Sequence, residues 1–248
     1  MNGLGKDAPI PLYYQIKTRL LESIETGQLK PGDQVPSERE LTTHFSVSRM
    51  TARQALTELE NQGYLYRLQG KGTFVATPKL DQPLAGLTSF TEDMRRRGLE
   101  PGAQVLSAEE VPAGRKAARA LGLSETAPVF RLERLRLAGG DPMALEIAHV
   151  PAALVPGLAQ EGTLERSLYG LLRERYGIRL VRATQSLEAV AANEYEAQVL
   201  HVKEGTPLLL LERVSRDEQD RPVEFVRSLY RGDRYRFITE LNRREEAP

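Results

Sequence analysis

The sequence has no cysteine, no tryptophan and only three histidines among its 248 residues. Without cysteine, the chain can form no disulfide, no thiolate metal site and no thiol nucleophile. The histidines His44, His149 and His201 lie far apart and match no metal-binding motif. We therefore expect a protein that holds no metal and no cofactor.

Long apolar runs and a net charge are also missing. No apolar run approaches the roughly 20 residues that cross a bilayer, and residues 1–7 contain no apolar signal segment. Lys and Arg together number 34, as do Asp and Glu, so the formal net charge is zero. We expect a cytoplasmic protein without a membrane partner, in which any contact with nucleic acid depends on a local basic surface.

The first third of the chain carries helix signals separated by turns. Apolar residues recur every four positions from Leu12 to Ile24, which predicts a first helix. Ser37 and Glu40 have the spacing of a capping box, which begins a second, short helix, and Ser48 can cap a third.

A glycine-rich tip at residues 69–72 separates two short strands, which predicts a hairpin after the third helix. Helix, short helix, tight turn, helix and hairpin, in this order, form a winged helix-turn-helix. We predict this domain over residues 1–77 and a proline-containing linker over residues 78–84.

Polar side chains near the start of the third helix and in the hairpin tip are candidate DNA contacts. The second helix of a helix-turn-helix enters the major groove, where Arg can bind guanine with two bonds and Thr can reach a base edge. Singly, each residue also fits a solvated helix face or an ordinary hairpin, and it is their order that favours DNA binding. The candidates are Arg39, Ser48, Arg49, Thr51, Arg53, Gln69, Gly70 and Lys71.

The rest of the chain contains an internal duplication. Residues 79 positions apart repeat, so that Glu133 and Arg134, for example, recur as Glu212 and Arg213. Each copy reads strand, short helix and hairpin, and two such copies would pair into one antiparallel sheet with helices on one face. We therefore predict an α+β domain over residues 85–248, and an α+β fold for the whole chain.

Arginines on a strand of this domain suggest an anion site. Arg134 and Arg136 share one face of the strand, about 7 Å apart, and two guanidinium groups at that spacing can hold one phosphate or carboxylate. A charged solvent face paired with glutamates is the alternative. Glu146, on the next strand, can pair with an arginine or accept bonds from a sugar hydroxyl.

The N-terminal motifs resemble those of a known family. Residues 36–41, 47–56 and 70–75 strongly resemble the winged-helix domain of the GntR family of bacterial transcription regulators. The resemblance implies that Arg39, Arg49, Thr51 and Arg53 contact DNA, and that the tip at Gly70 and Lys71 enters the minor groove. The chain departs from the pattern at Met50, where some members carry a small polar residue.

The C-terminal part, over about residues 84–244, resembles the UTRA effector-binding domain of the HutC subfamily, which is related in fold to chorismate lyase. Residues 87–92, 133–136, 142–146, 167–169 and 230–237 carry the resemblance. It implies a homodimer held by these domains on a near-palindromic operator. It also implies an effector pocket lined by Ser89, Phe90, Thr91, Arg134, Arg136, Glu146, Ser167, Glu224 and Tyr230.

Members with this pocket sense amino-sugar phosphates, and others sense different sugar phosphates, urocanate or phosphonate-related ligands. We favour an amino-sugar phosphate such as glucosamine 6-phosphate or N-acetylglucosamine 6-phosphate. The first alternative is the same class of regulator with another of these ligands. A lyase-like enzyme is a much weaker alternative, which rests on Glu146 and Glu224 as groups that could perform acid–base chemistry. No P-loop, GxSxG or GxGxxG motif supports that alternative, so we predict a ligand-controlled repressor and not an enzyme. A DNA-architectural protein without a ligand is a third and weaker alternative.

Overall fold

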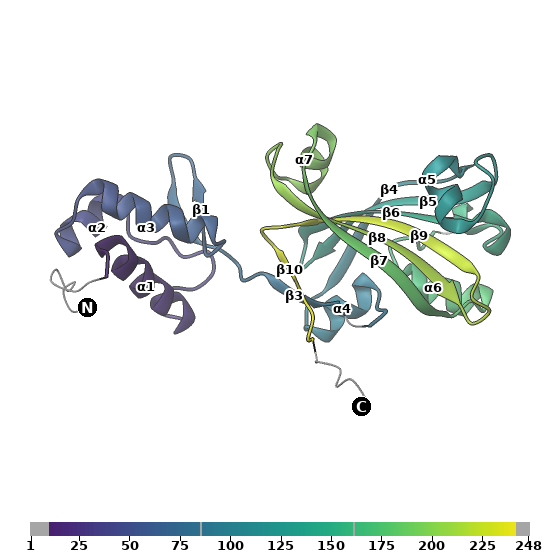
Figure 1. Cartoon of the computed structure of the whole chain (residues 1–248), viewed down its shortest axis with the longest axis horizontal. Helices are drawn as coiled ribbons and strands as arrows, with labels where there is room; N and C mark the ends of the chain where they lie inside the picture. Colours follow the sequence, from purple (N-terminus) through teal and green to yellow (C-terminus); the bar gives the residue numbers. More distant parts are fainter. Residues whose placement is uncertain (1–9, 85, 161, 242–248) are drawn as a thin grey trace, which may run out of the picture. The chain divides into compact units, whose positions relative to one another are not determined.

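The computed structural model describes residues 10–84, 86–160 and 162–241 (Figure 1). The chain forms two compact units, Met1–Leu80 and Asp81–Pro248, which are called unit 1 and unit 2 below. The outer ends of the two predicted domains, residues 1–9 and 242–248, lie outside the described residues.

Unit 1 has the predicted order of elements, and each helix begins where the sequence signals place it. The Ser37 hydroxyl accepts a hydrogen bond from the Glu40 amide, and the Glu40 carboxylate accepts one from the Ser37 amide, so the predicted capping box is confirmed. Ser48 caps the next helix in the same way by accepting from the Thr51 amide. The elements are α1 (Leu12–Glu25), α2 (Glu38–Phe45), α3 (Arg49–Asn61), β1 (Leu65–Leu68) and β2 (Gly72–Val75).

The core of unit 1 is built from the apolar faces of its three helices and its hairpin. The buried residues include Ile16, Leu20, Leu41, Phe45, Ala52, Ala55, Leu56, Leu59, Leu65 and Val75. Because the apolar stripe of α3 faces this core, its Arg49 and Arg53 side is turned to solvent. The packing therefore presents the polar face of α3 that a helix-turn-helix needs.

Part of the segment predicted as a linker forms a β-strand. Residues Leu80–Pro83 form β3, which pairs with β10 (Tyr235–Ile238), and the Leu84 amide donates to the Ile238 carbonyl over 2.8 Å. An ion pair between Asp81 and Arg236 joins the same two strands. A two-stranded ribbon tolerates Pro83, since a proline at an edge leaves no ladder bond unmade.

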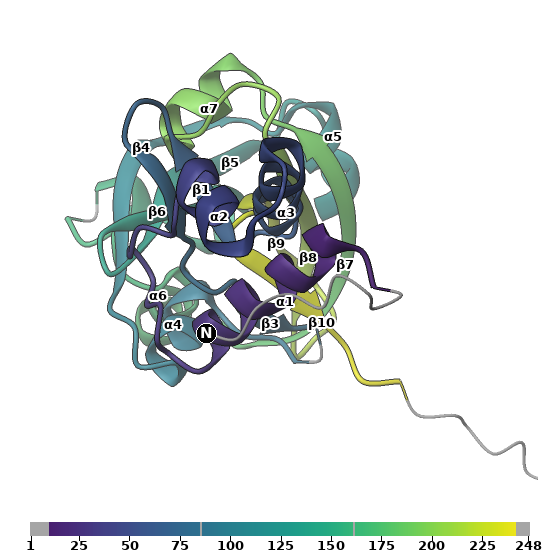
Figure 2. The ribbon, with the colours of Figure 1, turned by 90° about the vertical axis from the view of Figure 1, so that its left-hand side faces the viewer.

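Unit 2 confirms the duplication. Six antiparallel strands follow the order β4-β5-β6-β9-β8-β7, so the two copies meet where β6 pairs with β9. Figure 2 shows the curvature of this sheet. The first copy is β4 (Pro101–Pro112), α5 (Gly114–Leu121), β5 (Pro128–Ala138) and β6 (Asp141–Pro151), and the second is β7 (Leu180–Ala191), α7 (Glu194–Leu200), β8 (Pro207–Asp217) and β9 (Pro222–Arg231).

Helices cover both faces of the sheet, so the expectation of helices on one face was wrong. α6 (Leu168–Tyr176) packs with Phe130 and Leu132 on one face, whereas α7 packs with Leu135 and Leu145 on the other. α5 lies on the same face as α7, and α4 (Phe90–Arg96) on the same face as α6 (Figures 1 and 2). Both faces of β5 and β6 carry apolar side chains, and each face needs a cover.

Leu59→Ala should destabilise unit 1 by about 2–5 kcal/mol, because Leu59 is fully buried and its truncation leaves a cavity. Denaturant unfolding of the full chain measures this loss. Leu68→Ala is the matched control, since Leu68 is largely exposed on the hairpin. Equal losses in the two variants would contradict the described core.

Candidate effector site and DNA-binding surface

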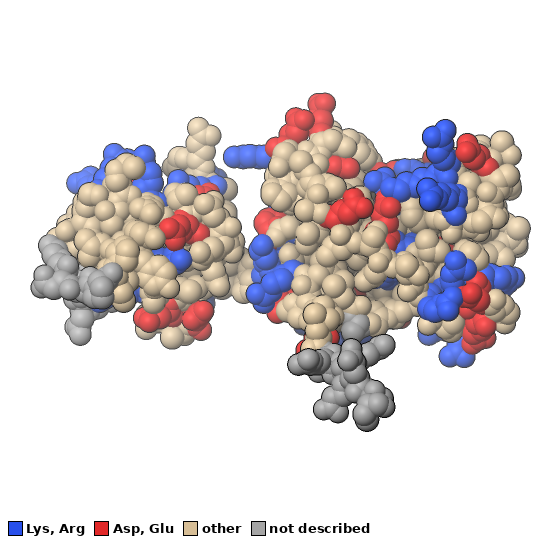
Figure 3. All heavy atoms as spheres, viewed as in Figure 1, with Lys and Arg blue, Asp and Glu red and all other residues tan. Residues whose placement is uncertain are grey.

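The start of α3 places the candidate DNA contacts on one exposed surface of unit 1. The side chains of Arg49 and Arg53, one helical turn apart, are 74% and 47% exposed. Ser48 and Thr51 share a hydroxyl–hydroxyl bond of 2.8 Å at the helix start, and Arg39 is exposed in the first turn of α2. Figure 3 shows Lys and Arg side chains gathered over α2 and α3.

Both α3 arginines bind one carboxylate that the sequence analysis did not single out. Glu38 accepts a hydrogen bond from Arg49 Nε over 2.9 Å and from Arg53 Nε over 2.9 Å. The hydrogen bonds from Arg53 and then Arg49 lower the pKa of Glu38 to about 2. The two arginines belong to the third helix and Glu38 to the second, so only the fold brings them together.

The hairpin tip completes this candidate surface. Gln69, Gly70 and Lys71 are exposed, and Gly70 adopts a positive φ of 73° that a glycine accepts without strain. Gln34 Nε2 donates to the Lys71 carbonyl over 3.1 Å and fixes the tip to the body of unit 1. The predicted contacts at the tip therefore lie on an anchored loop.

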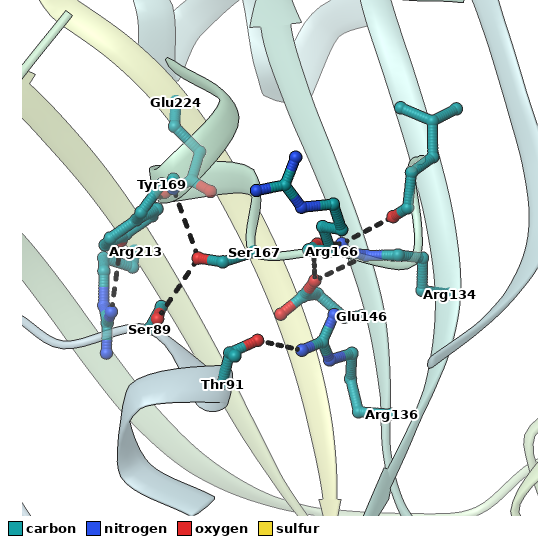
Figure 4. A network of polar contacts seen from close by, with 12 residues as sticks. Ser89, Thr91, Arg134, Arg136, Glu146, Arg166, Ser167, Tyr169, Arg213 and Glu224 are labelled. Carbon is teal, nitrogen blue, oxygen red and sulfur yellow. Dashed lines mark hydrogen bonds and ion pairs between the residues drawn. The ribbon is translucent and has the colours of Figure 1, made fainter. Parts of the chain in front are cut away.

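All nine predicted effector residues line one pocket of unit 2. The pocket has a cavity volume of about 40 Å³ and is partly open to solvent. Ser89, Phe90 and Thr91 reach it from the start of α4, and Ser167 from the start of α6 (Figure 4). The other five residues come from the sheet, where strand alternation points them to the same face.

Strand register explains which polar groups meet in the pocket. Arg134 on β5 lies opposite Glu146 on β6, which in turn lies opposite Ser228 on β9. Glu224 on β9 lies opposite Ser215 on β8. The sheet therefore carries two separate sets of directly paired polar residues, one across β5, β6 and β9 and the other across β8 and β9.

Arg134 is fully engaged within the protein. Its Nε and Nη2 donate to Glu146, and its Nη1 donates to the carbonyl oxygens of Leu164 and Arg166 over 2.9 and 2.8 Å. Burial raises the pKa of Glu146, but the charges of Arg134 and Arg136 outweigh this effect and hold that pKa below its ordinary value. Glu146 is therefore an ionised partner that already binds the Nε and Nη2 donors of Arg134.

Arg136 is the opposite case. It is 2% exposed, and its Nη2 donates to Thr91 Oγ1 over 2.9 Å while the guanidinium lies 4.7 Å from the centre of the Phe90 ring. Among the described residues, Nε and Nη1 of Arg136 have no hydrogen-bond partner although both atoms are buried. Burial lowers the pKa of Arg136 to about 10, so the group still carries its charge at neutral pH.

The other end of the pocket holds a second polar network. Ser215 Oγ and Tyr169 OH both donate to Glu224 Oε2, over 2.8 and 3.2 Å. Burial raises the pKa of Glu224 above its ordinary value. Arg213 donates to Gln185, to the Thr88 carbonyl and to Tyr169.

Tyr169 and Arg213 also line the pocket, and the sequence analysis did not place them there. The duplication contained a signal for Arg213, because this residue occupies the position of Arg134 in the second copy. For Tyr169, which lies on α6, the periodicity of the helix indicates only burial.

In the described part of the chain, no group of three or more histidine or acidic side chains is arranged to hold a metal ion. No helix in that part is both long and apolar enough to cross a membrane.

Comparison with known proteins identifies the class. Residues 12–75 match the family model described as "Bacterial regulatory proteins, gntR family", and residues 96–236 match the UTRA domain. The chain therefore belongs to the GntR family of DNA-binding transcription regulators, and within it to the HutC subfamily. It is a transcriptional repressor of that type, and not an enzyme.

Individual relatives match over nearly the whole chain. The HTH-type transcriptional repressor NagR of Bacillus subtilis is 42% identical over 97% of this chain and 98% of its own length. The histidine utilization repressor of Pseudomonas putida is 32% identical over 93% of this chain and 92% of its own length. The crystal structure of PhnF from Mycobacterium smegmatis superimposes with a TM-score of 0.65 at 36% identity, covering 93% of this chain and 99% of that chain.

Replacing each pocket arginine by methionine should affect stability differently. Arg134→Met should cost about 3–5 kcal/mol, because it leaves the buried charge of Glu146 without its partner. Arg136→Met should be neutral or stabilising, because it removes two buried donors that lack partners. Thermal unfolding without added ligand measures both. A loss in Arg136→Met as large as in Arg134→Met would contradict this account.

Proposed function

We propose that this repressor is released from DNA by a small anionic metabolite, and that the metabolite is a phosphorylated amino sugar. Glucosamine 6-phosphate and N-acetylglucosamine 6-phosphate are the first candidates. The observation that carries the proposal is the guanidinium of Arg136, which lines the pocket and is buried with two donors that have no partner among the described residues.

A phosphate group suits these donors. Guanidinium groups donate charge-assisted bonds to phosphate oxygens, and such bonds replace the hydration that burial has removed. Thr91 Oγ1, already bonded to Arg136, lines the same pocket as the hydroxyls of Ser89 and Ser167, which are 3.4 Å apart. They offer further donors to phosphate oxygens.

The remaining lining suits a sugar. Glu146, Glu224 and Tyr230 can accept bonds from hydroxyl groups or from an amino or amide nitrogen, and Ser228 lies between them on β9. A phosphonate or a carboxylate would satisfy Arg136 equally well and is the second candidate class. The sugar-facing groups favour the first.

Control of DNA binding requires a difference in affinity. A ligand shifts an equilibrium only if it binds one arrangement of the protein better than another. We propose that the effector binds the DNA-free arrangement better. We further propose that the chain acts in the cytoplasm as a homodimer on a near-palindromic operator, since two recognition helices have to match two half-sites.

A thermal-melting panel tests the effector class. The panel contains both hexosamine phosphates, trehalose phosphate, urocanate, a phosphonate and inorganic phosphate. A ligand at about 100 times its dissociation constant should stabilise the folded chain by roughly 2.7 kcal/mol. We expect a selective shift with a hexosamine phosphate that is lost in Arg136→Met. A shift with the phosphonate alone, or none beyond inorganic phosphate, would overturn the amino-sugar assignment.

The DNA-reading assignment is tested separately. Arg49→Ala should weaken specific binding by about 1–3 kcal/mol if Arg49 binds a guanine with two bonds, whereas Lys71→Ala should weaken binding to all sequences alike and reduce the salt dependence by about one unit. Fluorescence anisotropy with the selected operator and with a scrambled duplex measures both. Unchanged affinities in Arg49→Ala would remove this residue from the reading surface.

A further inference from the structure

We propose that Glu38 is a positioning residue for DNA reading, which holds Arg49 and Arg53 from behind so that the ends of both guanidinium groups face the bases. The inference rests on the proposed DNA-reading role of these two arginines and adds the residue that sets their geometry. It concerns unit 1 alone.

The first observation is that one carboxylate serves two helices. Glu38 is the first residue of α2, and its side chain is 20% exposed beneath the more exposed side chains of Arg49 and Arg53 on α3. Its two oxygens are divided between them: Oε2 accepts from Arg49 Nε, and Oε1 accepts from Arg53 Nε. Oε2 also accepts from Arg53 Nη2 over 3.2 Å.

The second observation is which edge of each guanidinium the carboxylate uses. Both arginines bind Glu38 through Nε, the nitrogen nearest the chain. Guanine O6 and N7 are read with two parallel bonds, and the terminal Nη1–Nη2 edge is the part of an arginine that reaches farthest. Because Glu38 takes the Nε side, the terminal edge of Arg49 is directed away from the carboxylate. Arg53 also donates from Nη2 to Glu38, so Nη1 is the nitrogen of its terminal edge that Glu38 does not bind.

The physical consequence is preorganisation. An exposed arginine has many rotamers, and fixing it on binding costs free energy. Glu38 makes part of that ordering a property of the free protein. The side chains are then held in the spacing that one helical turn of α3 defines, before DNA arrives.

Glu38 also acts against wrong sequences. Its negative charge lies beside the two arginines, so it partly cancels their attraction for phosphates, which is the same for every sequence. A matching base offers the two arginines hydrogen bonds that offset the attraction lost to Glu38, and a mismatched base does not. One residue thus improves discrimination both by ordering the readers and by weakening non-specific binding.

The test uses the full chain and an operator that the wild type selects from a random duplex library. The measured quantity is the ratio of affinities for this operator and for a scrambled duplex, at several salt concentrations. In Glu38→Gln we expect the ratio to fall by about tenfold, within the range of one bidentate base contact. Binding to the scrambled duplex should strengthen, and its salt dependence should steepen by up to about one unit.

Two more variants separate geometry from charge. Glu38→Asp keeps the charge but shortens the reach to Arg49 and Arg53, so we expect the ratio to fall while the salt dependence stays that of the wild type. Glu58→Gln is the matched control. Glu58 lies farther along α3, and its carboxylate pairs with Lys17 over 3.1 Å. This variant should keep the wild-type ratio.

Several outcomes would overturn the inference. One is a wild-type ratio in Glu38→Gln, and another is an equal weakening for both duplexes, which indicates a merely structural role. A wild-type ratio in Glu38→Asp would assign the effect to charge alone and remove the positioning role. Arg49→Ala, measured in parallel, distinguishes a failure of the Glu38 role from a failure of the proposed DNA-reading surface. If it lowers the ratio and Glu38→Gln does not, only the role of Glu38 falls, whereas no effect of Arg49→Ala removes the proposed reading surface itself.

Discussion

The ion pair between Arg134 and Glu146 is the interaction on which unit 2 depends. It crosses from β5 to β6 in the interior of the sheet, and Arg134 also binds the carbonyl oxygens of Leu164 and Arg166 just before α6. One buried guanidinium therefore fixes two strands and the approach to a helix whose first residues line the pocket. Removing either charge would leave the other buried without its ion-pair partner, which is costly in a medium of low polarity.

The charge balance of the pocket follows from this pair. Arg134 and Glu146 neutralise each other, and burial keeps the pKa of Glu224 above its ordinary value. Arg136 then remains as a buried cation with two donors, Nε and Nη1, that no described residue binds. Under the proposed function, an anionic ligand supplies the partners that the Arg136 donors lack.

Both units use a glutamate to set what an arginine can do. In unit 2, Glu146 occupies Arg134 and leaves the neighbouring Arg136 with unsatisfied donors. In unit 1, Glu38 binds the near side of Arg49 and Arg53 and leaves their outer edges exposed. The same pairing thus produces a buried structural link in one place and part of the proposed DNA-reading surface in the other, because the depth of burial differs.

The sequence by itself determined the class of protein, the winged helix and the duplicated antiparallel sheet, since capping boxes, apolar periodicity and the 79-residue repeat are local or additive signals. The resemblance to the UTRA domain also named nine residues, all of which line one pocket. The sequence analysis did not find Glu38, Tyr169 or Arg213, and it placed all helices on one face of the sheet. Only the tertiary structure decided between Arg134 and Arg136, which are indistinguishable by strand alternation. The register of β5 on β6 puts Glu146 opposite Arg134 and the small, uncharged Ala144 opposite Arg136, and that choice depends on how two strands pair and not on the pattern of either one.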